Sequence, residues 1–197
     1  MPDHLPIASF AHPDRVAPSH RRLRRRARRT LAVALAAALA MALVNCGGDS
    51  TTTADYADRV VVKKSERKMQ LLNRGKVLRE YRIALGDNPR GHKMREGDES
   101  TPVGDYLLDW RNPRSNYYKS IHVSYPNERD RALAKLLGVD PGGMIMVHGM
   151  PNHIRSETVR AEYRRRDWTN GCIAVQDHEM DEIWRLVRDG TPIRIQE

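Results

Sequence analysis

Alternation of apolar and polar positions predicts short strands across most of residues 59–197. Strands are expected at residues 60–62, 68–72, 77–85, 105–110, 119–126, 144–149 and 192–196. The second and third should form a hairpin through Asn73-Arg74-Gly75, where the glycine can take a positive φ. Residues 87–104 are rich in glycine, proline and charge, so a long loop is expected there.

Helical periodicity is found in segments that interrupt the strands. Residues 127–138 predict a helix with Asn127 as its N-cap and Gly138 past its end, and residues 157–167 also have helical character. The order of elements is rich in strands, with short helices inserted between them. This order favours a β-dominated α+β domain over a parallel α/β fold.

The last predicted helix, residues 177–190, is amphipathic. Its apolar positions recur at i, i+3, i+4 and i+7, namely Met180, Ile183, Trp184 and Val187. Asp177 is expected to be its N-cap and Gly190 to end it.

A different pattern precedes the domain. An arginine-rich run, Arg21 to Arg29, is followed by about fifteen apolar residues from Thr30 to Val44. A membrane span needs roughly 20 apolar residues, whereas a basic run before a shorter apolar core is typical of an export signal. Residues 1–46 are therefore assigned to an export signal, with a short signal anchor as the alternative. The small, polar residues 47–58 are assigned to a flexible linker.

The end of this signal suggests an anchor. Leu43-Val44-Asn45-Cys46 resembles the lipobox of bacterial lipoproteins, although Asn45 departs from the small residue that usually precedes the cysteine. The protein is expected in the periplasm or cell envelope, with Cys46 either lipidated as a membrane anchor or removed with the signal. In both cases Cys172 has no partner within the chain, which is unusual in an oxidising compartment.

The formal net charge of +9 is distributed unevenly. Residues 1–46 contain eight arginines and two aspartates, a charge of +6, and the rest contains 26 basic and 23 acidic side chains, a charge of +3. The body of the protein is close to neutral, which removes the main indication of nucleic-acid binding.

Cys172 and His148 are the candidates for nucleophilic chemistry. His148 ends an apolar strand and is followed by Gly149. An imidazole beside a thiol commonly lowers the thiol pKa and so activates it, and His148 is expected to do this for Cys172. Successive N–H groups at Asn170, Gly171 and Cys172 could face a developing oxyanion. The alternatives are an inert buried thiol and a structural histidine.

Two blocks carry a resemblance to a known family. Residues 145–149, "IMVHG", and residues 169–173, "TNGCI", resemble the signature blocks of the L,D-transpeptidase catalytic domain (the YkuD or ErfK family). Residues 123–143, "VSYPNERDRALAKLLGVDPGG", resemble the branch of that family that includes the YafK-like murein enzymes. Residues 97–106, "GDESTPVGDY", are similar to another motif of the family. The resemblance covers about residues 60–197 and implies a β-sandwich or barrel-like domain with short inserted helices, placed at residues 59–197.

The resemblance also implies a mechanism that uses no metal or organic cofactor. Cys172 would attack a carbonyl of a peptidoglycan tetrapeptide stem, the terminal D-alanine would leave, and a second amine would resolve the thioester. His148 would act as general base and then acid. Asn170, Gly171, Gly149 and Thr169 are assigned to the oxyanion or substrate-binding site.

Departures from the family pattern leave the acceptor open. Asn170 stands where the family has histidine, and Ala174 stands where arginine or asparagine is frequent. The acceptor could be a stem amine, water, or an outer-membrane lipoprotein. A peptidoglycan hydrolase or amidase using the same Cys–His site is therefore an alternative, and a non-catalytic wall-binding lipoprotein is the alternative of another class.

Other polar residues have structural explanations as well as functional ones. Trp168 is expected to pack below the cysteine loop or to stack on substrate, and Thr169 to bond the loop or touch substrate. The arginine run at residues 164–166 is expected to be solvated or to bind substrate. His92, Lys93 and Asp98 are expected near the cleft, and His122 and His178 in structural or surface positions. His148, His153 and Cys172 could also bind zinc, but no fourth ligand stands at a recognisable spacing.

Overall fold

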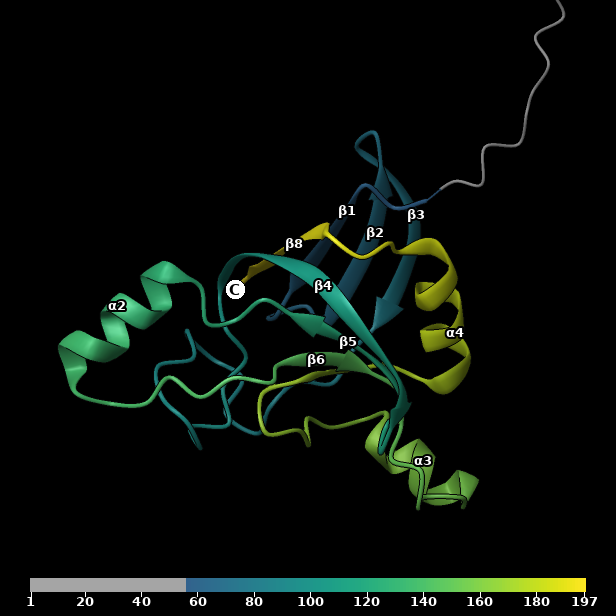
Figure 1. Ribbon diagram of the computed structural model, residues 1–197. Helices are drawn as coiled ribbons and strands as arrows, with labels where there is room; N and C mark the ends of the chain where they lie inside the picture. The colour runs from purple at the N-terminus through teal and green to yellow at the C-terminus, as the bar shows by residue number, and fades with distance from the viewer. Residues whose placement is uncertain (1–55) are drawn as a thin grey trace, which may run out of the picture. The chain divides into compact units, whose positions relative to one another are not determined.

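The computed structural model describes residues 56–197, where eight strands form one sheet in the order β3-β2-β1-β8-β4-β5-β6-β7 (Figure 1). The strands are β1 Arg59–Lys63, β2 Lys68–Asn73, β3 Lys76–Arg82, β4 Gly104–Ser115, β5 Tyr118–Val123, β6 Met146–His148, β7 Ile173–Ala174 and β8 Thr191–Gln196. The predicted export signal, Cys46 and most of the predicted linker lie outside the described residues. Within residues 56–197, the helices are all too short or too polar to span a membrane.

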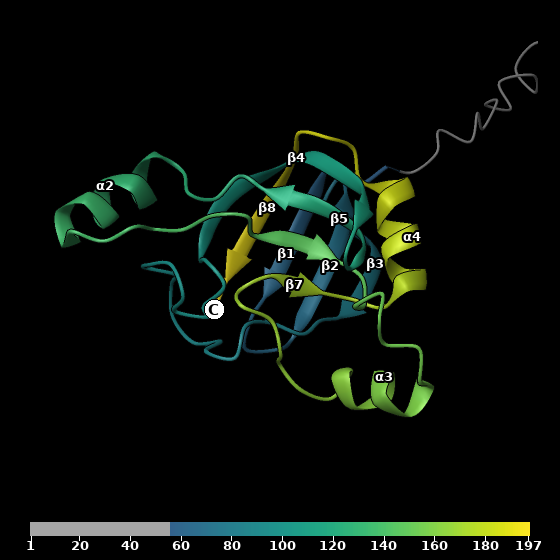
Figure 2. The same cartoon turned by 60° about the horizontal axis from the view of Figure 1, so that its bottom comes forward.

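The sheet curls until its two ends meet. Ala84, just past the end of β3, bridges Ala174 of β7, and each backbone N–H donates to the other carbonyl at 2.9 Å. Figure 2 shows β7 close to the β2–β3 end of the sheet. The bridge therefore joins β7, at one end of the sheet, to the residues that follow β3, at the other end. The predicted β-dominated α+β fold with a barrel-like sheet is confirmed.

The core fills the inside of this curl. Alternate strand positions are buried there, among them Val60, Val62, Leu71, Ile121, Val147, Ile173, Ile193 and Ile195. Helix α4 (Asp177–Leu186) adds Met180 and Ile183 to the same core, as its periodicity predicted. Burying each such side chain stabilises the fold by roughly 1.5–3 kcal/mol.

The local sequence correctly predicted one hairpin turn and both ends of one helix. The β2–β3 hairpin turns at Arg74 and Gly75, which both have positive φ, 49° and 77°, as a two-residue hairpin requires. Helix α2 (Glu128–Leu137) has Asn127 as N-cap in a capping box and Gly138 in the left-handed conformation. Figure 1 shows α2 extending away from the sheet.

The predicted ends of the last helix were wrong. The N-cap of α4 is Gln176, because the Asp177 carboxylate instead accepts the Met150 N–H at 2.8 Å. The helix stops at Leu186 and not at Gly190. Its last carbonyls are satisfied by Arg111, whose guanidinium donates to the carbonyls of Trp184, at 2.6 Å, and Val187.

Other boundaries also differ from the sequence prediction. β4 continues past residue 110 to Ser115, because it pairs with β5 along a hairpin. Helix α3 (Glu157–Tyr163) is shorter than predicted and has no buried residue. The two-residue strand β7 was not predicted, since so short a segment carries no period. Ala57, assigned to the linker, is buried and bridges Val187.

Candidate active site

A pocket of about 220 Å³ opens on the outer face of the sheet, across β5, β6 and β7. Its lining residues are Ser115, Tyr117, Ser120, Met144, Met146, His148, Trp168, Thr169, Asn170 and Cys172. Four of the predicted site residues therefore meet in one cavity: His148, Thr169, Asn170 and Cys172. Gly149 and Gly171 lie beside it and do not line it.

Strand pairing places the cysteine and the histidine on the same face. β6 and β7 run parallel with Val147 opposite Ile173 and His148 opposite Ala174. Val147 and Ile173 are fully buried in the core. Because side chains alternate along a strand, His148 and Cys172 point to the other side, into the pocket.

Burial controls the protonation of Cys172. The Met146 N–H donates to Sγ at 3.4 Å, and the thiol lies 3.6 Å from the Met144 carbonyl oxygen. Burial raises the pKa of the Cys172 thiol above its usual 9.0, although the Met146 N–H and the positive charge of Lys93 oppose this shift. The resting form at neutral pH is therefore the thiol.

His148 is oriented as a neutral base. Its Nδ1 lies 2.7 Å from the Gly149 carbonyl oxygen, and a carbonyl can only accept, so the proton is on Nδ1 and Nε2 has a free lone pair. Burial lowers the pKa of His148 to about 4, with the bond to Gly149 partly opposing it. The expectation that His148 lowers the thiol pKa is wrong for this resting state, because a neutral imidazole supplies no positive charge.

These directions predict the pH dependence of thiol reactivity. The rate of Cys172 alkylation by iodoacetamide should rise with pH and keep rising past 9.0, the usual thiol pKa, because the thiolate reacts and burial disfavours it. Alkylation followed by intact-mass spectrometry from pH 4 to 11 measures this. His148→Ala is the control and should keep the same alkaline profile. A rate plateau between pH 5 and 7 that disappears in His148→Ala would show a thiolate–imidazolium pair instead.

Gly171 and Gly149 are required by close contacts within the protein. Gly171 has φ +118°, and a Cβ there would lie 2.6 Å from the Ser100 carbonyl oxygen. A Cβ on Gly149 would lie 2.7 Å from Asp177 Oδ1 and 2.9 Å from Tyr118 Cβ. The Gly149 N–H already donates to two backbone carbonyls. Close packing within the protein therefore explains both glycines without a substrate.

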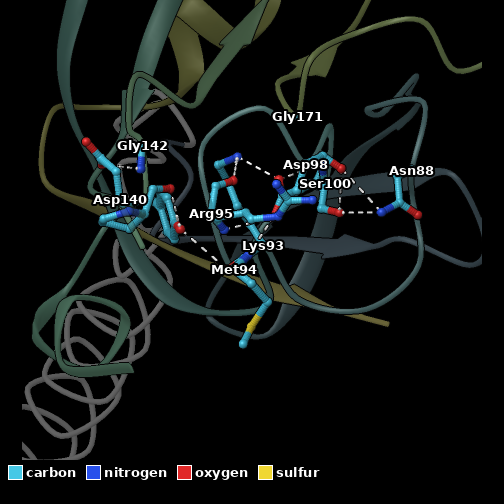
Figure 3. Close-up of polar contacts among 12 residues, drawn as sticks. Asn88, Lys93, Met94, Arg95, Asp98, Ser100, Asp140, Gly142 and Gly171 are labelled. Carbon is cyan, nitrogen blue, oxygen red and sulfur yellow. Dashed lines mark hydrogen bonds and ion pairs between the residues drawn. The ribbon is translucent and has the colours of Figure 1, made fainter. Parts of the chain in front are cut away.

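The loop before β4 supports the cysteine loop through a buried ion pair (Figure 3). Lys93 Nζ donates to Asp98 Oδ1 at 2.8 Å, and Lys93 is 3% exposed. Asp98 also accepts three backbone N–H groups, including that of Ser100 at 3.1 Å. Burial alone would raise the pKa of Asp98, but Lys93 and these N–H groups lower it overall. This network fixes Ser100, which lies against Gly171.

His92, from the same loop, lies elsewhere. Its Nδ1 accepts the Val103 N–H at 3.0 Å, and its Nε2 lies 3.2 Å from Asp130 Oδ1. It lines a second cavity beside α2 and not the cysteine pocket.

Thr169 holds the cysteine loop in shape. Its hydroxyl donates to the Cys172 carbonyl at 2.7 Å and accepts the Gly171 N–H at 3.2 Å. Within residues 56–197, the backbone N–H groups of Cys172 and Asn170 have no hydrogen-bond acceptor in the protein. Those two donors remain available to an oxyanion, whereas the Gly171 N–H is engaged.

Aromatic rings form one wall of the pocket. Tyr117 lies 4.6 Å from the His148 ring and 6.1 Å from the Trp168 ring, centroid to centroid. Trp168 also contacts His148 edge-on at 5.6 Å and Tyr163 at 5.0 Å. Trp168 therefore both packs within the protein and faces the cavity. Tyr117 was not singled out from the sequence, since its position depends on the β4–β5 hairpin.

The remaining polar candidates lie outside the pocket lining. His122 Nδ1 is 2.7 Å from Asp109 Oδ1, and its ring stacks on Trp110 at 4.9 Å. Arg166 lies over the Tyr163 ring at 5.3 Å. Across residues 56–197, no three histidine, cysteine, aspartate or glutamate side chains gather closely enough to hold a metal ion.

Comparison with known proteins identifies relatives of this chain. YafK of Escherichia coli (strain K12), which is named only provisionally as an L,D-transpeptidase, is 30% identical over 135 residues, 65% of this chain and 46% of YafK. A crystal structure of Pgp2, the helical cell shape determining protein of Campylobacter jejuni, is 28% identical with a TM-score of 0.53 over 76% of this chain and 52% of Pgp2. A point mutant of Pgp2 gives a TM-score of 0.54 at 28% identity over 73% of this chain and 48% of that one.

The chain spans about half the length of these relatives. Its residues 57–195 match the family described as YkuD, the L,D-transpeptidase catalytic domain. The matched residues include both strands that carry His148 and Cys172 to the pocket. Because the match covers most of the chain, this protein belongs to the L,D-transpeptidase catalytic domain family.

Proposed function

We propose that this protein is a peptidoglycan L,D-transpeptidase that acts through an acyl-enzyme on Cys172. The observation that carries the proposal is the pocket into which parallel strands β6 and β7 direct both His148 and Cys172. Membership of the L,D-transpeptidase family supports the reaction class. The tetrapeptide stem of peptidoglycan is the proposed acyl donor.

The first half-reaction forms a thioester. Sγ of Cys172 attacks the stem carbonyl while Nε2 of His148 takes the thiol proton. Because both groups are neutral at rest, the proton moves during the attack. The free N–H groups of Cys172 and Asn170 supply donors for the oxyanion. The C–N bond then breaks, and the terminal D-alanine leaves with the proton from His148.

The second half-reaction decides between transferase and hydrolase. His148 Nε2 removes a proton from the incoming acceptor as it attacks the thioester, and the thiol is restored. An amine of a second stem gives a cross-link, an amine of an outer-membrane lipoprotein gives an attached protein, and water gives hydrolysis. We propose the stem amine as the principal acceptor.

The function can be tested on the purified protein with disaccharide-tetrapeptide, with products identified by mass spectrometry. The expected result is a dimer that has lost one D-alanine. Tripeptide alone would assign the site to hydrolysis, and addition of a lysine-bearing lipoprotein tests the third acceptor. A protein that forms no product and no covalent adduct with any stem would support the non-catalytic alternative.

The proposed substrate requires an exported protein. We therefore expect the full chain to be recovered from the cell envelope, cleaved or anchored near residue 46, and fractionation with immunoblotting measures this. Cys46→Ala should release the protein from membranes if that cysteine is lipidated. Unchanged membrane retention of Cys46→Ala would indicate a signal anchor, and a full-length cytoplasmic product would contradict export.

A further inference from the structure

A hydroxyl beside His148 faces the pocket without a partner. Ser120 lines the pocket and is 2% exposed. Within residues 56–197, its Oγ makes no hydrogen bond. The other serine and threonine hydroxyls of the lining are engaged: Ser115 Oγ accepts the Tyr117 N–H at 3.0 Å, and Thr169 Oγ1 bonds within the cysteine loop.

The pairing of β5 with β6 explains why Ser120 lies there. Ser120 is directly opposite His148 in the antiparallel register. The neighbouring pairs carry the ladder bonds, since Val123 N–H donates to the Ile145 carbonyl and Gly149 N–H to the Lys119 carbonyl. Ser120 and His148 thus form a non-hydrogen-bonded pair, in which the Cα atoms are about 4.5 Å apart and the side chains are closest.

Three neighbouring strands therefore present side chains to the same cavity. Ser120 of β5 lies directly opposite His148 of β6, and His148 is itself opposite Ala174 of β7. Cys172 comes two residues before Ala174, so it lies diagonal to His148 on the same face of the sheet. Ser120, His148 and Cys172 all line the one pocket, so the hydroxyl can contact a stem that is bound there.

The Ser120 hydroxyl gains no hydrogen bond from the fold, and it is not among the fully enclosed, unpartnered side-chain atoms of residues 56–197, so it is accessible from the cavity. A ligand that displaces water from the cavity must replace the hydrogen bonds that this hydroxyl makes to solvent. The ten lining residues include no aspartate, glutamate, lysine or arginine, and His148 and Cys172 are neutral at rest. A neutral group that both donates and accepts, such as a peptide amide, suits this lining better than an ion does.

We propose that Ser120 is a substrate-binding residue whose hydroxyl hydrogen-bonds a backbone peptide group of the stem, next to the carbonyl that Cys172 attacks. This inference rests on the proposed function for the identity of the ligand. Ser120 acts on binding and on the position of the stem, and it takes no part in the covalent steps.

Binding of disaccharide-tetrapeptide to Cys172→Ala, measured by calorimetry, tests the proposal without turnover. Adding Ser120→Ala should weaken binding roughly 3- to 10-fold, the effect of one lost hydrogen bond. The melting temperature should not fall, because the fold loses no bond. Ser124→Ala is the matched control: its Oγ accepts the Leu107 N–H at 2.8 Å outside the pocket. That variant should bind normally and lose a little stability.

The outcomes separate this proposal from the proposed function. Equal binding with and without Ser120→Ala would overturn the role of Ser120, even if the unmodified protein is acylated by stems. Ser120-dependent binding without any acylation of Cys172 would support Ser120 and refute the transpeptidase. If Cys172→Ala does not bind the stem, both proposals are wrong. A lowered melting temperature in Ser120→Ala, with unchanged binding, would assign the hydroxyl to the fold.

Discussion

Cys172→Ala is expected to abolish covalent acylation completely while leaving the fold intact. Sγ makes only long contacts, 3.4 Å to the Met146 N–H and 3.6 Å to the Met144 carbonyl oxygen, so its removal costs little stability. Intact-mass spectra after incubation with stem peptide, and with a carbapenem as the family resemblance suggests, measure the adduct. Thermal melting measures the fold.

Cys172→Ser is the matched control for shape. It keeps a side chain of similar size at the same place but replaces the thiol by a much weaker nucleophile, so acylation should be lost there too. An adduct of the same mass on wild type and Cys172→Ala would remove Cys172 from the mechanism. If Cys172→Ala does not fold while Cys172→Ser does, the claim that removing Sγ costs little stability is wrong.

His148→Ala is expected to slow acylation by roughly 10²–10⁴-fold, the usual loss of general acid–base help. With the pKa of His148 lowered to about 4 by burial, the base form exists at all pH values above that. The wild-type rate should therefore persist below pH 6.5 and fall only as the pH approaches 4. Rates of adduct formation against pH measure both effects.

Asn170→Ala is the matched control on the exposed side of the pocket. Its effect should be smaller, because its backbone N–H survives the substitution and the side chain does not titrate. His148→Gln is a control for lost packing, because glutamine fills more of the buried space than alanine does but cannot act as the base. If His148→Ala keeps the wild-type rate, another group is the base. His92 is a poor replacement, because it bonds Val103 and Asp130 away from the pocket.

A larger effect of Asn170→Ala than of His148→Ala would reverse the assigned roles. The side-chain amide of Asn170 would then be part of the oxyanion site. The pocket lining allows this, because Asn170 borders the cavity next to Thr169.

Several features could be predicted from the sequence because they depend mainly on neighbouring residues. Alternating apolar positions predicted most strands, and the Asn127 and Gly138 caps bound helix α2 as expected. The turn at Arg74-Gly75 has a positive φ at two adjacent positions, and the glycine indicated it in the sequence. The two blocks that contain His148 and Cys172 also stood out, because each joins a reactive side chain to a glycine and an apolar strand.

How these segments meet depends on contacts that form only in the folded protein. Ser120 is 28 residues before His148 in the sequence, and no local pattern reveals that β5 and β6 place them opposite each other. The end of α4 at Leu186 depends on Arg111 from β4. The protonation of His148 and Cys172 depends on burial, which is set by the whole fold. Which side chains can react follows from the amino-acid sequence, because reactivity is a property of residue type. The tertiary structure decided their partners, solvation and charge, because these arise from contacts between segments distant in the chain.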